Sequence, residues 1–124
     1  MNIVHITSRK AWKEAISAGK FIAPSLETEG LIHCSTYSQA VPVAEKYYKG
    51  QTELVLLVID PTRLTSELKW EPPAEGAPPP GVSPGEAFPH IYGPINLDAI
   101  VRAMDFEPGS NGQFVLPASL PTDP

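Results

Sequence analysis

Proline limits what the second half of this chain can fold into. The sequence has 124 residues and 15 prolines, most of which follow Trp70. Proline lacks a backbone N–H and has a fixed φ, so it interrupts helix interiors and is confined to the ends or edges of strands. Residues 71–85, with the sequence EPPAEGAPPPGVSPG, are therefore predicted to form a loop with an extended, solvated backbone.

The clearest strand is Leu54–Ile59, with the sequence LVLLVI. It is apolar at every position, so both of its faces are expected to be covered. Asp60 and Pro61 end it. Shorter extended segments are predicted from alternation and β-forming residues. They are residues 2–7, 21–23, 31–35, 68–71, 88–92 and 99–106, with an edge strand at 113–116.

Two helices are predicted, both in the first half of the chain. Ser8 can cap the first and Gly19 can end it. Its predicted apolar face consists of Ala11, Trp12, Ala15 and Ile16. The second helix is expected at residues 38–48, where Pro42 is tolerable only near the first turn. Its predicted apolar face consists of Val43, Ala44, Tyr47 and Tyr48.

These elements predict a small, single α+β domain at residues 1–107, followed by a tail rich in proline, glycine and serine at 108–124. A doubly wound fold is not expected, because helices stop alternating with strands after about residue 50. The composition is 42% hydrophobic and 19% charged, which is typical of a globular protein.

Charge and cysteine content narrow the functional classes. The formal net charge of -5 argues against non-specific binding to nucleic acid or anionic membranes. Cys34 is the only cysteine, so no intrachain disulfide can form. The N-terminus lacks the pattern of a signal peptide, and no apolar run is long enough to cross a bilayer. We therefore expect a cytoplasmic protein.

The chain contains three histidines, and each lies in a segment predicted to be extended. A strand alternates its faces with period two, so each histidine shares a face with a hydroxyl two residues later. The pairs are His5 with Thr7, His33 with Ser35, and His90 with Tyr92. We predict that the three units converge on one polar cleft. The alternative, for any one of them, is a half-buried histidine satisfied by a backbone carbonyl.

Other chemistries have less support in the sequence. A histidine metal site is an alternative, but the three histidines are widely separated and form none of the close ligand pairs typical of zinc sites. Cys34 is adjacent to His33 on the strand and should point to the opposite face, into packing. No phosphate-binding glycine motif and no GxSxG motif is present.

The ordered motifs of the chain resemble an uncharacterised family, domain of unknown function 952. They are VHIT, the Trp12 helix, GLIHCST, Gln39, LVLLVIDPTRL, KWEPP and FPHIYGPIN. Together they extend from about Ile3 to about Val101, which is most of the chain. This family name implies no activity.

A more distant resemblance is to the ADP-ribosyltransferase fold, including tRNA 2'-phosphotransferase. His5 and Thr7 are similar to the His-x-Thr/Ser pair that contacts the ribose of NAD there, and the LIHCS segment around His33 is similar to the second motif. The third motif of that fold carries a glutamate, and here its nearest equivalent is His90. Glu71 or Glu86 is a candidate replacement.

This resemblance implies a split transferase-like β core and NAD, or another ADP-ribose-type nucleotide, as the ligand. The implied activity is ADP-ribosyl transfer or cleavage of the glycosidic bond of NAD, with no metal and with an unknown acceptor. The implied catalytic residues are His5, His33 and His90. The implied ligand-binding residues are His5, Thr7, Arg9, Ser35, Tyr92 and Glu71.

Each assignment has an alternative. Tyr37 or Tyr92 would stack on the nicotinamide or belong to ordinary packing, and Arg9 would neutralise phosphate or be a solvated charge at a helix start. Glu71 would be a polar site residue or solvated surface. For the whole protein, the alternatives are a non-enzymatic nucleotide- or small-ligand-binding module and the histidine metal site.

Overall fold

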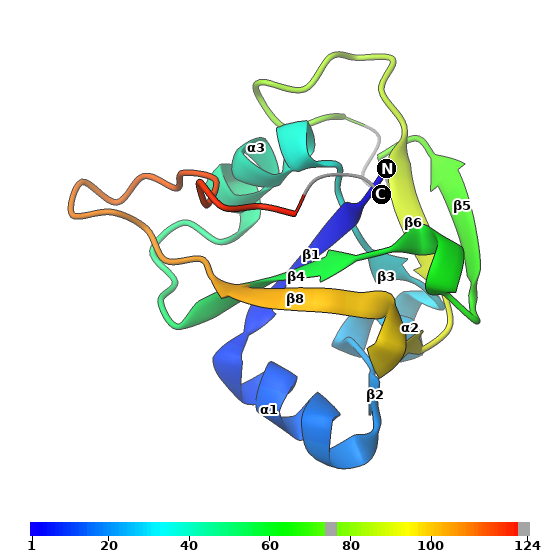
Figure 1. The fold of residues 1–124 in the computed structure, drawn as a ribbon. Helices are drawn as coiled ribbons and strands as arrows, with labels where there is room; N and C mark the ends of the chain where they lie inside the picture. Colours follow the sequence, from blue (N-terminus) through cyan, green and yellow to red (C-terminus); the bar gives the residue numbers. More distant parts are fainter. Residues whose placement is uncertain (74–76, 122–124) are drawn as a thin grey trace.

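The computed structural model describes residues 1–73 and 77–121 and has an α+β fold with antiparallel sheets (Figure 1). The helices of this part of the chain are α1 (Arg9–Ala18), α2 (Pro24–Glu29) and α3 (Tyr37–Tyr47). The strands are β1 (Ile3–Ser8), β2 (Lys20–Phe21), β3 (Ile32–His33), β4 (Leu54–Ile59), β5 (Glu67–Glu71), β6 (Phe88–Tyr92), β7 (Ile95–Asn96) and β8 (Ile100–Asp105). Two short 3-10 turns, η1 (Pro61–Arg63) and η2 (Leu97–Ala99), follow β4 and precede β8.

The sheet that organises the core has the strand order β1-β4-β8. Its central strand β4 occupies the predicted range and is buried along its whole length. Val55, Leu57 and Ile59 pack into the core on the α1 side. The alternate residues pack with α3 in a second core, and they are Leu54, Leu56 and Val58. The prediction that both faces of this strand are covered is confirmed.

A second sheet, with the order β3-β6-β5, presents one apolar and one polar face. Ile32, Ile91 and Leu68 pack into the core on the α1 side. His33, His90 and Lys69 are cross-strand neighbours in one row, and period two places them on the opposite face. In the described chain an isolated backbone bridge between Val4 and Ser35 joins this sheet to the first. A third pair, β2 with β7, is two residues long.

Helix α1 forms as its end signals predict. The Ser8 side chain accepts a hydrogen bond from the Ala11 N–H, and Gly19 ends the helix with φ of 85°. Ala15 is buried, but Ile16 is 54% exposed, so the prediction that Ile16 belongs to the apolar face is wrong. The helix packs on the sheet with one narrow stripe, and Ile16 lies beside that stripe.

Helix α2 was not predicted. Residues 21–23 were expected to be an extended piece closed by Pro24, but Pro24 instead opens the helix, where its missing N–H costs nothing. Gly30 ends the helix with φ of 80°. The strand expected at 31–35 is consequently shorter, and only Ile32–His33 pair as β3.

Helix α3 begins one residue before the predicted start. Thr36 and Gln39 form a capping box, in which each side chain bonds the backbone of the other residue. Pro42 lies beyond the first turn, so the helix tolerates the loss of one intrahelical bond there. Ala44 is buried, whereas Tyr47 is 43% exposed, so its predicted place on the apolar face is only partly realised.

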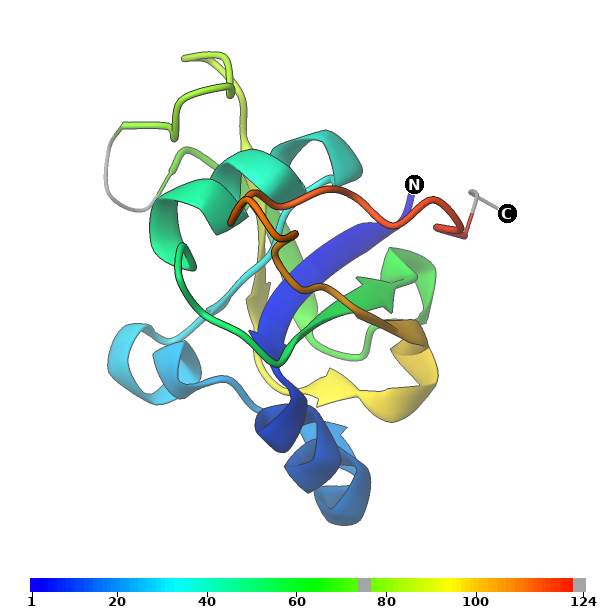
Figure 2. The same cartoon turned by 90° about the vertical axis from the view of Figure 1, so that its left-hand side faces the viewer.

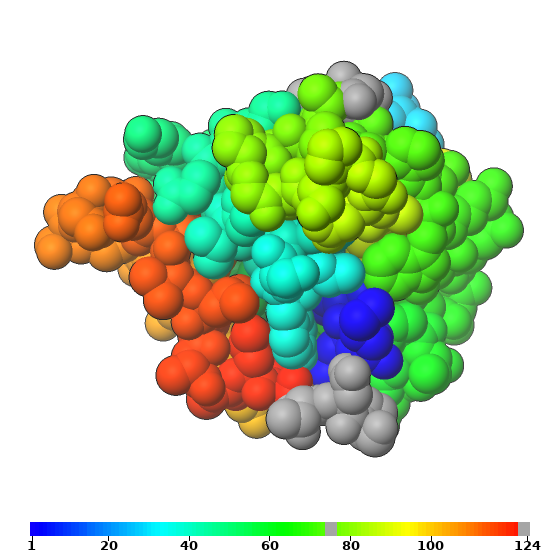
Figure 3. Space-filling model, turned by 90° about the horizontal axis from the view of Figure 1, so that it is seen from above, coloured from blue at the N-terminus to red at the C-terminus, as the bar shows by residue number. Residues whose placement is uncertain are grey.

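Four of the longer strands match the predicted ranges closely, whereas the two-residue strand β7 has no counterpart among the predicted segments. β6 occupies 88–92 as predicted, and β1, β5 and β8 lie within one residue of prediction at each end. The edge strand expected at 113–116 does not form. The loop predicted at 71–85 is irregular where it is described, and residues 74–76 lie outside the described residues. Figure 3 shows part of this loop against the start of α3, where Gln39 bonds Glu86.

The segment after β8 packs along α3 instead of leaving the molecule (Figure 2). Phe114 is 3% exposed, and its ring centroid lies 5.2 Å from that of Phe106. The Phe114 N–H donates to the Glu45 carboxylate at 2.9 Å, and the Tyr37 hydroxyl donates to the Pro121 carbonyl at 2.6 Å. The domain boundary at residue 107 stays a prediction. Substitutions that remove the contacts of Phe114 can test it.

No helix in residues 1–73 and 77–121 is both long and apolar enough to span a membrane.

Candidate functional site

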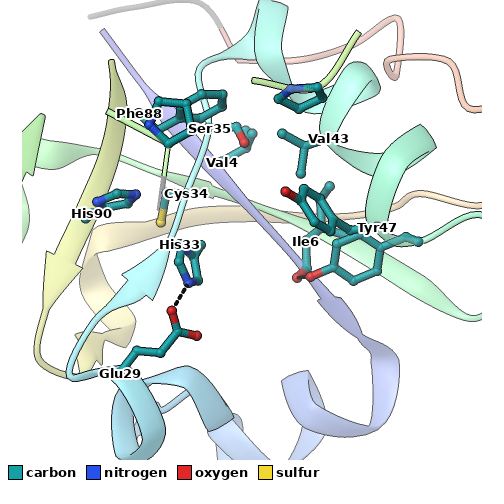
Figure 4. Close-up of a pocket in the computed structure, with 13 residues that line it drawn as sticks. Val4, Ile6, Glu29, His33, Cys34, Ser35, Val43, Tyr47, Phe88 and His90 are labelled. Atoms are coloured by element: carbon teal, nitrogen blue, oxygen red, sulfur yellow. Dashed lines mark hydrogen bonds and ion pairs between the residues drawn. The ribbon is translucent and has the colours of Figure 1, made fainter. Parts of the chain in front are cut away.

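A cavity of about 440 Å³ lies between α3, β1 and the polar face of the β3-β6-β5 sheet (Figure 4). Its walls combine apolar and aromatic side chains with two histidines, one serine, one cysteine and one glutamate. The lining residues are Val4, Ile6, Glu29, His33, Cys34, Ser35, Val43, Tyr47, Tyr48, Pro73, Pro79, Phe88 and His90. Both the volume and the mixture are typical of small-molecule sites.

His33 and His90 meet in this cavity because β3 and β6 pair in a register that places them opposite each other. Their ring centroids lie 5.4 Å apart, and the rings meet edge to face. The predicted convergence therefore holds for these two histidines.

Behind His90 lies a hydrogen-bonded pair with Glu71. One oxygen of the Glu71 carboxylate accepts from His90 Nδ1 at 2.8 Å and from the Tyr92 hydroxyl at 2.5 Å. The bond from Tyr92, and then the bond from His90, lower the pKa of Glu71, so this carboxylate is anionic at neutral pH. The same bond raises the pKa of the Tyr92 hydroxyl, which therefore keeps its proton.

This arrangement fixes what His90 can do. Because Nδ1–H donates a hydrogen bond to Glu71, the neutral form of His90 carries its lone pair on Nε2. Nε2 has no hydrogen-bond partner within residues 1–73 and 77–121. In the same residues, every fully buried side-chain nitrogen or oxygen has a partner. Nε2 is therefore not fully buried, and because His90 lines the cavity, this nitrogen is the candidate to accept a hydrogen bond from a ligand there.

His33 has its own carboxylate partner. Its Nε2 lies 3.1 Å from Glu29 Oε1, four residues earlier at the end of α2 (Figure 4). The two side chains are 41% and 48% exposed, so this pair lies at the mouth of the cavity, whereas the His90 side chain is 5% exposed.

His5 does not share the cavity surface with the other two histidines. It lies on the face of β1 opposite Val4 and Ile6, is 8% exposed, and packs 5.2 Å from the Phe21 ring. Its Nδ1 donates to the His33 carbonyl at 2.5 Å. Burial lowers the His5 pKa to about 4, so this imidazole is neutral and serves packing. The expected three-histidine cleft is thus a two-histidine cleft.

The other predicted ligand contacts are distributed over the molecule. Ser35 lines the cavity, but Thr7 follows His5 on the other face of β1. Arg9 pairs with Asp105 at 2.8 Å, outside the cavity lining. Tyr37 holds the C-terminal segment. Glu86 accepts from Gln39 and from the Ser83 N–H, and so organises the loop.

The Cys34 thiol is 4% exposed and packs in the core on the α1 side, as predicted, with one edge on the cavity. Burial raises its pKa, so it is a poor nucleophile at neutral pH. Among the described residues, no group of three or more histidine, cysteine, aspartate or glutamate side chains could hold a metal ion.

The sequence did not predict several residues of the site, among them Glu29, Tyr47, Tyr48 and Phe88. Glu29 lies on the helix that was not predicted, so its approach to His33 was not foreseen. Tyr47 and Tyr48 were assigned to core packing, yet both line the cavity. The signal for Glu29 was its place just before the GLIHCST motif, four residues from His33.

Residues 6–103 match the family described as "Protein of unknown function (DUF952)". The chain belongs to the DUF952 family. The first of the predicted resemblances is thereby confirmed over most of its expected range. No curated protein matches the chain.

Solved structures of CC0527 from Caulobacter crescentus have a similar fold. The crystal structure is 31% identical, with a TM-score of 0.77, and the match covers 93% of this DUF952 chain and 94% of that one. The solution NMR structure is 32% identical, with a TM-score of 0.70 and 90% coverage of each chain. These similarities give no support to the ADP-ribosyltransferase resemblance.

Proposed function

We propose that this DUF952 domain binds a small nucleotide of the NAD or ADP-ribose type in the cavity between α3 and the β3-β6-β5 sheet. The observation that carries the proposal is the Glu71–His90 pair, which leaves the Nε2 lone pair of a cavity-lining histidine free for a ligand, in a partly open cavity with apolar and aromatic walls. A ribose hydroxyl is a suitable donor to that nitrogen, and Tyr48 or Phe88 offers a surface for a flat ring.

The same geometry supports a reaction at the glycosidic bond. A water molecule held by His90 Nε2 would attack the anomeric carbon, transfer its proton to that nitrogen, and form the new C–O bond. The C–N bond would break, and nicotinamide would leave as a neutral molecule with the bonding electron pair. Glu71 would orient His90 and stabilise the imidazolium that forms. In this scheme His90 is the catalytic residue, and Glu71 and Tyr92 are positioning residues.

Calorimetric titration with NAD tests the binding. We expect saturable heat in the wild type and a loss of about tenfold or more in affinity for His90→Gln and for Glu71→Gln, because each removes a charge-assisted bond of the pair. Glu67→Gln is the matched control, since Glu67 lies on the same strand, is 66% exposed, and does not bond His90. The proposal fails if all three variants bind NAD with the affinity of the wild type, or if the wild type gives no heat.

One observation favours a binding module without turnover. Neither Glu71 nor Glu86 lines the cavity, and Glu29, the one carboxylate in its described lining, bonds His33. The ribose-holding glutamate of the transferases thus has no counterpart in direct reach of a ligand. Chromatographic detection of released nicotinamide distinguishes an enzyme from a binding module. Release of nicotinamide supports the enzyme, and saturable binding without release supports the module.

A further inference from the structure

The described lining of the cavity contains an acidic side chain but no lysine or arginine. Glu29 contributes a carboxylate to its lining, and Glu71 lies directly behind His90. No lysine or arginine belongs to the lining formed by residues 1–73 and 77–121. An anionic phosphate group would therefore find no cationic partner inside.

Two lysines lie over tyrosine rings and are not part of this lining. Lys69 Nζ lies 4.8 Å from the centroid of the Tyr92 ring and 3.9 Å from Glu67. Lys46 Nζ lies 5.2 Å from the centroid of the Tyr47 ring at the rim. The rings that remain inside are Tyr48, whose hydroxyl donates to the Ile6 carbonyl, and Phe88 of β6.

A space with aromatic walls and a carboxylate at its mouth favours an organic cation. Aromatic faces attract positive charge, and the attraction grows when water is excluded. Glu29 adds a direct Coulomb attraction that no lysine or arginine of the described lining offsets. A neutral ring of the same shape would gain the packing but neither electrostatic contribution.

From these observations we infer that the cavity selects a flat, cationic ring, such as a pyridinium, over its neutral counterpart. The inference rests on the proposed function and deepens it, because it states that the nicotinamide end of NAD enters the cavity while the pyrophosphate stays outside. Glu29 is the residue that sets this specificity.

The test compares 1-methylnicotinamide, a cation, with neutral nicotinamide, which has the same ring and carboxamide. Affinities are measured by calorimetry or NMR titration at about pH 8, where histidine is ordinarily neutral. We expect the cation to bind roughly tenfold more tightly to the wild type. The preference should fall to about threefold or less in Glu29→Gln and stay unchanged in Glu27→Gln, a variant of an exposed carboxylate on the same helix.

Raised salt supplies a second measurement that needs no variant, because it should weaken the binding of the cation and leave that of nicotinamide unchanged. Equal or tighter binding of nicotinamide, a preference insensitive to Glu29→Gln, or no binding of either probe would overturn the inference. NAD binding without a preference for the cation would leave the proposed function intact. A preference for the cation without NAD binding would support the inference about the cavity and remove NAD as the proposed ligand.

Discussion

Replacing Phe114 with alanine tests whether the segment after β8 is part of the folded domain. Phe114 is 3% exposed and packs against Phe106, and its N–H is bonded to Glu45 of α3. Removing a buried phenylalanine costs about 3–5 kcal/mol. Because the segment has no regular structure and can collapse partly into the hole, we expect the lower end, about 3 kcal/mol. That would be a large share of the 5–15 kcal/mol typical of a domain.

The assay is urea denaturation followed by circular dichroism. Val115→Ala is the matched control, since its side chain is the next one along and is 75% exposed, and it should change the free energy of unfolding by less than about 0.5 kcal/mol. A tail that merely rests on the surface would make the two variants alike. A loss below about 1 kcal/mol for Phe114→Ala would refute the reasoning. An unchanged m-value would show that the segment stays attached in the folded variant.

Three further substitutions test the packing elsewhere. Gly93→Ala should lower stability by about 1–3 kcal/mol, because a Cβ at this position would lie 2.4 Å from Ser66 Oγ, whereas Gly85→Ala meets open space; thermal melts compare the two. His5 has a folded pKa of about 4 against an ordinary 6.5, so only the unfolded chain gains this proton between those values, and the free energy of unfolding should fall by about 3 kcal/mol as the pH drops across that window. In urea denaturation at a series of pH values, His5→Gln should reduce the fall of the unfolding free energy within that window. Gln39→Ala should cost about 1–3 kcal/mol by urea denaturation, because its buried amide both caps α3 and holds the proline-rich loop.

Local signals predicted the elements whose boundaries are set by nearby residues. The uniformly apolar β4 and the Ser8 and Gly19 ends of α1 are examples. Helix α2 was missed because a proline can either end an extended piece or open a helix, and the choice depends on Gly30 six residues later. The strand predicted at 113–116 failed because the Phe114 side chain packs on α3 and the segment finds no ladder partner.

The candidate site was predictable only in part. Period two correctly placed His90 and Tyr92 on one face, since both reach the same Glu71 oxygen. It could not say which face of β1 lines the cavity. Val4 and Ile6 line it, so His5 lies on the opposite face, where it packs against Phe21. The approach of Glu71 to His90 depends on the pairing of β5 with β6, which joins segments separated by the proline-rich loop.

The bridge between Val4 and Ser35 joins the two sheets through backbone hydrogen bonds. The reciprocal hydrogen bonds at this bridge are both 2.8 Å long, and the cavity lies along the line where the two sheets meet. Amide hydrogen exchange should therefore be slowest in β4, at the centre of the first sheet, and fastest in β5, at the free edge of the second. A ligand that touches both sheets would stabilise this junction, and slowed exchange at the Val4 and Ser35 amides would report its binding.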